Sequence, residues 1–196
     1  MTVILGYFRR MAPWMLGALV LFAGARFLWL KSKKRPVRAA RELALCLFVM
    51  FCAGLASQTL LPEWHVGQNG RSYPATVFSE GWNARRGGIN LLPLHTIREY
   101  FGRAGGAAFA VNIVGNVVMF APIGFFLPLL WRRWRVWWKT TLAGAGISAC
   151  IELVQVLTLR SVDVDDVLLN ALGVLAGCGM YRVYAAVVDK KGRKDV

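Results

Sequence analysis

Carboxylates and carboxamides recur in the last third of the sequence, at the edges of strongly apolar segments or inside them. The stretch "SVDVDDVLLN" places Asp163, Asp165 and Asp166 directly before a run of aliphatic residues, and Glu152 lies inside the preceding apolar segment. Two carboxyl groups in different surroundings can hold different protonation states at neutral pH, which general acid–base catalysis requires. Glu152, Asp163 and Asp166 are therefore the catalytic candidates.

Helix capping offers a structural role for the same aspartates. Asp163 or Ser161 could be the N-cap of the helix that follows, and Asp165 and Asp166 would then be stabilised by the positive end of its dipole. If that helix is regular from its start, Asp165 points away from the side that Asp163 and Asp166 share. The sequence alone leaves both roles open.

Glu152 needs another explanation, because it lies more than two turns inside an apolar segment. A carboxyl group at that depth must be protonated, paired or near water. The structural alternative is a hydrogen bond to Asn116 or Gln155. His95 could approach the aspartates and help to hold a divalent ion, but neither His95 nor His65 has ligand spacing relative to the acids, so we predict no metal site.

The elements that position these side chains have the composition of membrane helices. Hydrophobic residues make up 57% of the chain and charged residues 17%, and the mean hydropathy is +0.47, whereas soluble domains are less apolar and more charged. A helix needs about 20 residues to cross the ~30 Å hydrocarbon layer, and it satisfies its backbone amides internally. We therefore predict an all-α polytopic membrane helical bundle with about five transmembrane helices plus a short interfacial helix. The five segments are Met11–Leu30, Leu43–Leu61, Val111–Leu130, Lys139–Leu159 and Asp166–Val188.

The net charge of +14 would suit a nucleic-acid-binding protein, but the basic residues are distributed in a way that argues against this class. They concentrate between Lys31 and Arg41, between Trp131 and Lys139, and from Arg182 onward, on alternate connections between the predicted helices. Such alternation is typical of the positive-inside rule, and tryptophan is enriched at membrane interfaces. We predict no nucleic-acid partner, a cytoplasmic C-terminus and an N-terminus outside. The alternative for the first segment is a signal sequence that begins at Arg9 and Arg10.

Four regions follow from this distribution. Residues 1–61 form an N-terminal transmembrane hairpin, and residues 62–110 form a long, glycine-rich loop that faces outward and suits a flexible connector. Within Ile89–Phe101 of that loop, apolar residues recur at helical spacing, which predicts a short interfacial helix. Residues 111–188 form a three-helix core that carries most of the intramembrane polarity, and residues 189–196 form a basic cytoplasmic tail.

Polar and small residues recur at helical spacing on the three core helices, where polar side chains are costly. At ~1.5 Å per residue, Asn116, Glu152 and Asn170 all lie roughly 10 Å below the outer ends of their helices. Glycines on the same faces would permit close helix approach. The faces therefore predict one shared polar pocket that opens outward. They comprise Asn112, Gly115 and Asn116; Gly144, Ser148, Glu152 and Gln155; and Asp163, Asp166, Asn170, Gly173 and Gly177.

Four of these segments together resemble the VanZ-like family, whose namesake is a teicoplanin-resistance protein. The resemblance covers about residues 90–180, and each motif alone is weak, whereas the four in series are fairly specific. Leu94 departs from the family, which often has an aromatic residue after the proline. The motifs are "NLLPLHTI" (90–97), "NIVGNVVMFAPIGF" (112–125), "IELVQ" (151–155) and "DVDDVLLNALG" (163–173).

The resemblance implies a bacterial, multi-pass membrane protein of the cell envelope, linked in some members to resistance to lipid-tailed glycopeptide antibiotics. It implies no established reaction, and no cofactor is indicated. The residues that match the polar motifs are the predicted ligand-binding set: Asn90, Asn112, Asn116, Glu152, Gln155, Asp163, Asp166 and Asn170. Pro122 matches as well and is expected to bend its helix.

Three functional hypotheses remain. The leading one is a non-catalytic protein whose pocket binds a lipid-linked cell-wall precursor, a lipoglycopeptide or another amphiphile, among membrane lipids. The second is a membrane-embedded enzyme that acts on a lipid-linked substrate through Glu152 with Asp163 or Asp166. The third is a structural subunit of a membrane complex.

Overall fold

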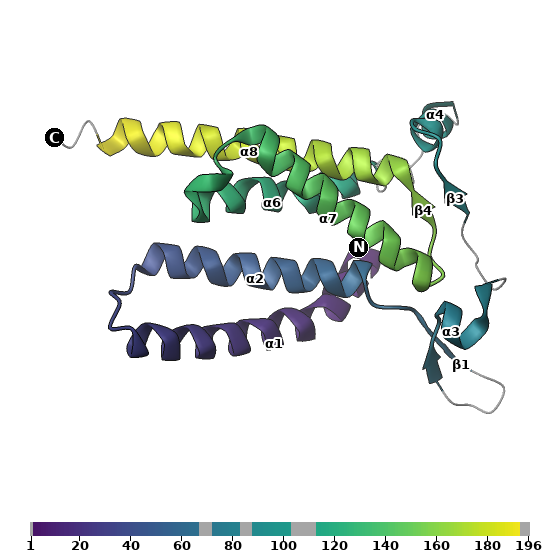
Figure 1. Ribbon diagram of the computed structural model, residues 1–196, viewed down its shortest axis with the longest axis horizontal. Coiled ribbons are helices and arrows are strands. Elements are labelled where there is room, and N and C mark those ends of the chain that lie inside the picture. The colour runs from purple at the N-terminus through teal and green to yellow at the C-terminus, as the bar shows by residue number, and fades with distance from the viewer. Residues whose placement is uncertain (1, 67–71, 83–87, 103–112, 193–196) are drawn as a thin grey trace. The chain divides into compact units, whose positions relative to one another are not determined.

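The computed structural model describes residues 2–66, 72–82, 88–102 and 113–192. The chain divides into two units, Met1–Leu61 and Pro62–Val196, and each has its own internal packing. The colour scale of Figure 1 follows the chain through both units. Asn112, one of the predicted ligand-binding residues, lies outside the described residues.

The first unit is a hairpin of two long helices, α1 (Thr2–Ser32) and α2 (Ala39–Thr59), which run antiparallel (Figure 1). Both consist mainly of apolar residues over a length that satisfies the span requirement. The helices meet through side chains, because a Cβ atom on Gly54 would lie 2.8 Å from Met11 Cε. At the loop end, Arg26 forms a two-atom ion pair with Glu42, with Nε to Oε2 at 2.8 Å and Nη2 to Oε1 at 3.0 Å.

The region expected to be a flexible connector contains regular structure where it is described. Strands β1 (Trp64–Val66) and β2 (Ser72–Pro74) form an antiparallel pair, and the short helix α3 (Val77–Glu80) follows. Thr76 and Ser79 form a capping box at the start of α3, a pairing that satisfies two backbone amides reciprocally.

The predicted interfacial helix is shorter than its motif. Residues Ile89–Asn90 form strand β3, and helix α4 spans His95–Gly102. Leu94 precedes the helix with φ at 63°, a left-handed conformation that leucine rarely adopts. Leu94 shares helical spacing with later apolar residues, but it lies before the helix, which begins at His95.

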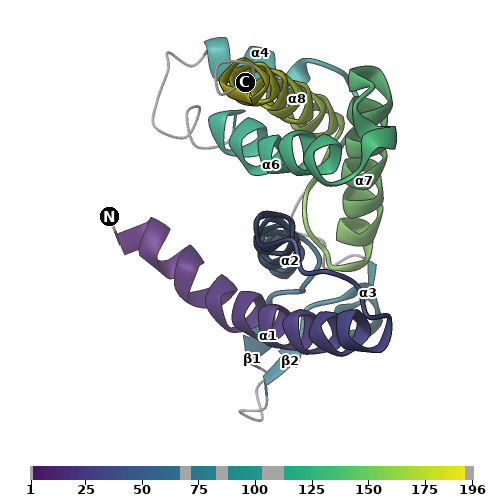
Figure 2. The ribbon, with the colours of Figure 1, turned by 90° about the vertical axis from the view of Figure 1, so that its left-hand side faces the viewer.

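Three apolar helices build the core of the second unit: α6 (Gly115–Leu130), α7 (Trp137–Leu157) and α8 (Val164–Gly192). A 3-10 turn, η3 (Arg132–Trp134), links α6 to α7, and the short strand β4 (Val162–Asp163) precedes α8. Figure 2 shows α6 beside α8, with α7 against them. Pro122 and Pro128 lie inside α6, where each removes a backbone hydrogen-bond donor.

Glycines let α6 and α8 approach each other at the level of the backbone. A Cβ atom on Gly173 would lie 2.3 Å from the carbonyl oxygen of Val117, and one on Gly177 would lie 1.9 Å from that of Ala121. Gly124 of α6 is equally restricted by α8. The predicted role of glycine in close approach is confirmed for Gly173 and Gly177, whereas the space around Gly115 is open.

The predicted all-α membrane bundle is confirmed. Among the described residues, four helices are long and apolar enough to cross a membrane: Arg9–Ser32, Ala39–Thr59, Trp137–Leu157 and Val164–Asp189. The third predicted span corresponds to the shorter apolar helix α6, which has 16 residues. The chain is therefore a multi-pass membrane protein.

Candidate functional site

Asp163 joins the head of α8 to the loop before α4. Strands β3 and β4 pair in parallel, with Asn90 opposite Asp163. Asn90 Nδ2 donates to Asp163 Oδ1 at 3.0 Å, and the Thr96 hydroxyl donates to Asp163 Oδ2. The backbone N–H of Asp165 also donates to Asp163 Oδ1, at 2.9 Å, which makes Asp163 the N-cap of α8. Both carboxylate oxygens of Asp163 are therefore occupied by donors from the protein.

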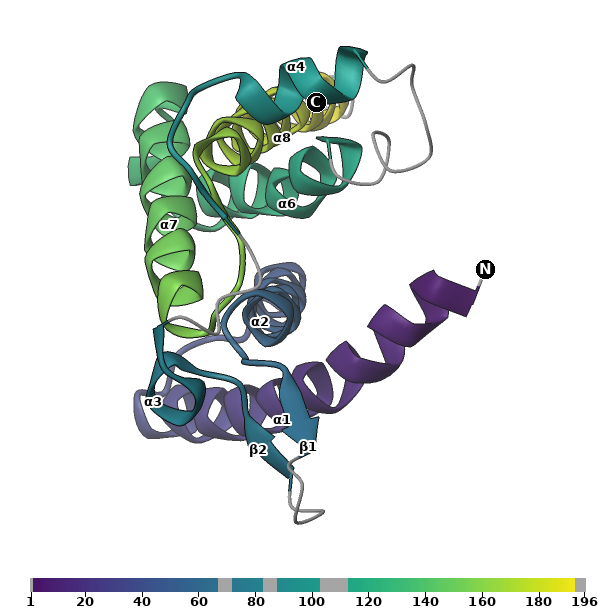
Figure 3. The same cartoon turned by 90° about the vertical axis from the view of Figure 1, so that its right-hand side faces the viewer.

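Asp165 caps helix α4 from another part of the chain. Its Oδ1 accepts from the Leu94 N–H at 2.5 Å, and its Oδ2 accepts from the Ile97 N–H at 3.1 Å. The residue before α4 is a leucine, which has no side-chain acceptor for these amides. Asp165 supplies the acceptor, and its charge lies at the positive end of the α4 dipole. Figure 3 shows α4 beside α8, and Asp165 is completely buried between them (0% exposed).

Glu152 binds the same turn from the side of α7. Its Oε2 accepts from the backbone N–H of Asp163 at 3.1 Å, and the residue is buried. No hydrogen bond to Glu152 Oε1 occurs within the described part of the chain. Glu152 therefore fixes the start of α8 with one oxygen and keeps the other available.

Two further contacts lie deeper between the helices. Asn116 Nδ2 of α6 donates to Asp166 Oδ1 at 2.5 Å, and Asn170 Nδ2 of α8 donates to Ser148 Oγ of α7 at 2.8 Å. The Oδ1 atom of Asn170 is buried and has no hydrogen-bond partner among the described residues. Because Ser148 and Glu152 are four residues apart on α7, Asn170 and Glu152 lie at neighbouring turns.

The predicted polar stripe of α8 thus contacts three different elements. Asp163 binds the loop before α4, Asp166 contacts α6 and Asn170 contacts α7. The structure brings these three residues together with Asn90, Asn116 and Glu152. The backbone carbonyl of Gln155 accepts from the Arg160 N–H at 3.1 Å in the turn after α7. His95 is exposed at the start of α4.

Sequence reasoning missed three contributors: Thr96, Ser148 as a partner of Asn170, and Asp165 as a cap. Asp165 was expected to point away from the shared face, and it does bind a different element, but the partner was not foreseen. A usable signal existed in the motif "NLLPLHT", which begins a helix without an N-cap acceptor of its own. Such a helix requires an acceptor from elsewhere in the chain.

The geometry disfavours acid–base catalysis by Asp163 and Asp165. Asp163 and Asp165 each accept two or more hydrogen bonds through both oxygens, so neither is arranged to exchange a proton with a substrate. Over the residues that the structure describes, no group of three or more His, Cys, Asp or Glu side chains is arranged to hold a metal ion. Glu152, Asp166 and Asn170 each keep an oxygen that accepts no hydrogen bond from the described residues.

Comparison with known proteins is consistent with the resemblance read from the motifs. The sequence profile of the VanZ/LLP1 family matches residues 48–185, which is more than half of the chain and includes every residue of the polar cluster. Comparison with curated proteins and with solved structures gives no match. The chain therefore belongs to the VanZ/LLP1 family of proteins.

Proposed function

We propose that this protein is a non-catalytic component of the bacterial cell envelope that binds the polar group of an amphiphile between α7 and α8. The ligand class is a lipid-linked cell-wall precursor or a lipid-tailed glycopeptide, and binding changes susceptibility to teicoplanin-type antibiotics. The N-terminus and the loop 62–110 face outward, so that the ligand enters from the outer side of the membrane.

The observation that carries the proposal is the unused hydrogen-bonding capacity of a buried amide oxygen and of a carboxylate oxygen at the same interface. Asn170 Oδ1 is buried without a hydrogen-bond partner among the described residues, whereas buried polar atoms in proteins are nearly always paired. Glu152 Oε1 also accepts no hydrogen bond from the described residues. An ammonium group or two hydroxyl groups of a ligand would supply a donor to each atom, since the atoms lie at neighbouring turns of the same interface.

The surrounding contacts support a site that is held in place before the ligand arrives. The Asp163 N–H fixes Glu152, and the Ser148 hydroxyl fixes Asn170. Fixed acceptors lose less conformational entropy on binding than mobile ones. The apolar tail of an amphiphile would remain in the lipid around the exposed sides of the helices.

The test is the variant Glu152→Gln in cells that depend on the protein for reduced teicoplanin susceptibility. Glutamine keeps a carbonyl oxygen that can accept from the Asp163 N–H, but it lacks the charge and the second acceptor. We expect wild-type amounts of inserted protein and loss of the phenotype. An unchanged phenotype at equal protein levels would contradict the proposal.

The enzyme hypothesis receives less support. It needs Asp163 or Asp166 as an acid or metal ligand beside Glu152, yet Asp163 is occupied by three donors. Asp166 keeps one oxygen without a hydrogen bond in the described region, so an enzymatic role would rest on Asp166 with Glu152. Turnover of polyprenyl-phosphate or glycolipid by the purified protein, lost in Glu152→Gln, would favour this alternative.

A further inference from the structure

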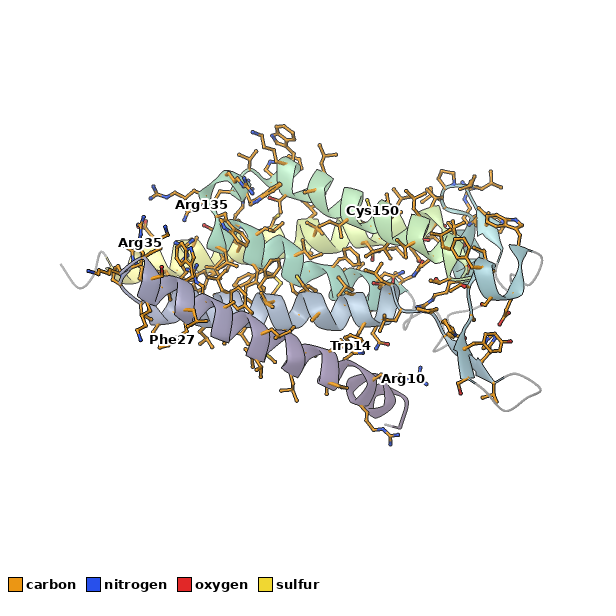
Figure 4. All side chains as sticks on the ribbon, turned by 60° about the horizontal axis from the view of Figure 1, so that its bottom comes forward. Arg10, Trp14, Phe27, Arg35, Arg135 and Cys150 are labelled. Carbon is orange, nitrogen blue, oxygen red and sulfur yellow. The ribbon has the colours of Figure 1, made fainter. Side chains whose placement is uncertain are left out.

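A separate cavity lies at the loop end of the α1–α2 hairpin, outside the residues that match the family. Its volume is about 310 Å³, at the lower end of the range for small-ligand sites. Basic residues dominate its lining: Arg26 of α1, Arg35 and Arg38 of the connecting loop, and Arg41 of α2. Figure 4 labels Arg35 at this end of the hairpin.

The charge in this cavity is largely uncompensated. The carboxylate of Glu42 is bound by Arg26 through both oxygens, at 2.8 and 3.0 Å. No carboxylate lies within ion-pair distance of Arg35, Arg38 or Arg41 in the part of the chain that the structure describes. Arg35, Arg38 and Arg41 therefore contribute three positive charges to the lining, whereas the carboxylate of Glu42, which lines the same cavity, is bound by Arg26.

Guanidinium groups select for phosphate in particular. Their planar fork of N–H donors matches two phosphate oxygens at once, and they are less strongly hydrated than ammonium groups. Arg38 is also the N-cap residue of α2, and its side chain does not cap the helix. The positive end of the α2 dipole therefore adds to the field of the arginines.

The surroundings indicate a lipid rather than a solute. Both α1 and α2 are long enough to cross a membrane, so the loop that joins them lies at the level of the headgroups. Trp29, which is half-exposed, lines the same cavity and lies 4.6 Å from the Arg26 guanidinium. Tryptophan rings are typical of this interfacial level, where a phosphate carries acyl chains.

We propose that this cavity binds the phosphate of an anionic phospholipid headgroup. The site is independent of the polar cluster on α6, α7 and α8, and either site can exist without the other.

The experiment uses the full-length protein in detergent and native mass spectrometry with added phosphatidylglycerol or phosphatidylcholine. The test variant is the triple Arg35→Gln, Arg38→Gln, Arg41→Gln. The matched control is Lys31→Gln, Lys33→Gln, Lys34→Gln, which removes the same charge at the same end of the hairpin without changing a residue of the cavity lining. Both variants lose three charges, so general attraction to anionic lipid falls equally in both.

We expect phosphatidylglycerol to bind the wild type and the lysine variant with similar affinity and the arginine variant about tenfold more weakly. Phosphatidylcholine should bind all three proteins weakly. Equal loss in both variants, or no loss in the arginine variant, would overturn the proposal. Inorganic phosphate that displaces phosphatidylglycerol from the wild type at equal concentration would also overturn it, by showing that the site takes a soluble anion.

A folding control keeps the test decisive. Each variant is compared by thermal unfolding in the same detergent without added lipid. If the triple arginine variant does not fold, the single variants Arg35→Gln, Arg38→Gln and Arg41→Gln replace it, and each should weaken phosphatidylglycerol binding more than Lys33→Gln does. Single variants that all bind like Lys33→Gln would contradict the proposal.

Discussion

The two units of the molecule use apolar helices of similar length in different ways. In the hairpin, the apolar windows of α1 and α2 are 0% and 22% buried, whereas those of α7 and α8 are 33% and 28% buried. The helices of the hairpin meet through flexible methionine side chains beside Gly54, whereas α6 and α8 meet backbone to backbone at Gly173 and Gly177. The clearest difference is therefore the helix contact, which is made by side chains in the hairpin and by backbone atoms in the three-helix unit.

The polar groups differ in the same way. Among its described residues, the hairpin has one ion pair, Arg26 with Glu42, at its loop end. The three-helix unit has a connected set of hydrogen bonds that runs from Asn90 through Asp163 to Glu152. Polar contacts within a membrane protein define which helices pair. The comparison places most of the polar contacts between distant segments in the second unit.

The largest effect is expected from Gly177→Ala. The added Cβ would lie 1.9 Å from the carbonyl oxygen of Ala121, so α6 and α8 would have to separate, at a cost of about 3 kcal/mol in the free energy of unfolding. Unfolding in mixed micelles with increasing dodecyl sulfate measures it. The matched control Gly24→Ala in α1 has nothing within 4 Å of the new atom and should change stability little. Similar losses in both variants would remove the contrast between the units.

The next largest effect is expected from Asp165→Asn. The amide leaves one oxygen for the two N–H donors of Leu94 and Ile97 and turns an NH₂ group toward the other donor. Loss of a hydrogen bond to a buried charge costs about 2–3 kcal/mol, seen here as a lower free energy of unfolding in mixed micelles. Glu63→Gln, at an exposed carboxylate, serves as the control and should be close to neutral.

A smaller effect on stability is expected at Glu152, where two substitutions should differ from each other. Glu152→Gln keeps an acceptor for the Asp163 N–H and should change the free energy of unfolding by less than about 1 kcal/mol. Glu152→Ala removes the acceptor and leaves that buried N–H unpaired, which should cost about 2 kcal/mol. Thermal unfolding in detergent compares the two. If both variants lose the same stability, the charge of Glu152 serves folding and not a ligand.

The smallest effect is expected at the ion pair of the hairpin. Its side chains are 26% and 17% exposed for Arg26 and Glu42, and a partly exposed pair contributes at most about 1 kcal/mol. A double-mutant cycle with Arg26→Gln and Glu42→Gln measures the coupling. A coupling several times larger would show that the hairpin is held by specific recognition after all.

Much of the fold could be predicted because lipid imposes a simple rule on length and composition. The long spans and the close approach at Gly173 and Gly177 follow from hydropathy and from residues repeated every four positions. The inward placement of Asn116, Glu152 and Asn170 also agrees with their spacing, although Asn116 contacts α8 from α6, whereas Glu152 and Asn170 lie between α7 and α8. The close approach at Gly124 was not predicted, because its sequence neighbours are large apolar residues and no polar residue at helical spacing indicates that this side of the helix faces a partner.

The remaining features depend on contacts between distant parts of the sequence. Asp165 binds amides of residues 94 and 97, about seventy positions earlier, and helical spacing contains no information about such a partner. The strands β1 and β2 are equally short, at three residues each, and too brief to show an alternating pattern. Asp163 was correctly considered as an N-cap, but its bonds to Asn90 and Thr96 required the tertiary structure.

The central claim is that the acids at the head of α8 have different tasks: Asp165 holds α4, and Glu152 keeps an oxygen for a ligand. Amide hydrogen exchange of residues 89–102 in Asp165→Asn and Glu152→Gln, under identical conditions in detergent, tests it most directly. The account predicts faster exchange at Ile97 in Asp165→Asn and wild-type exchange in Glu152→Gln. Equal acceleration in both variants would contradict it, because Glu152 would then be part of the same structural clamp.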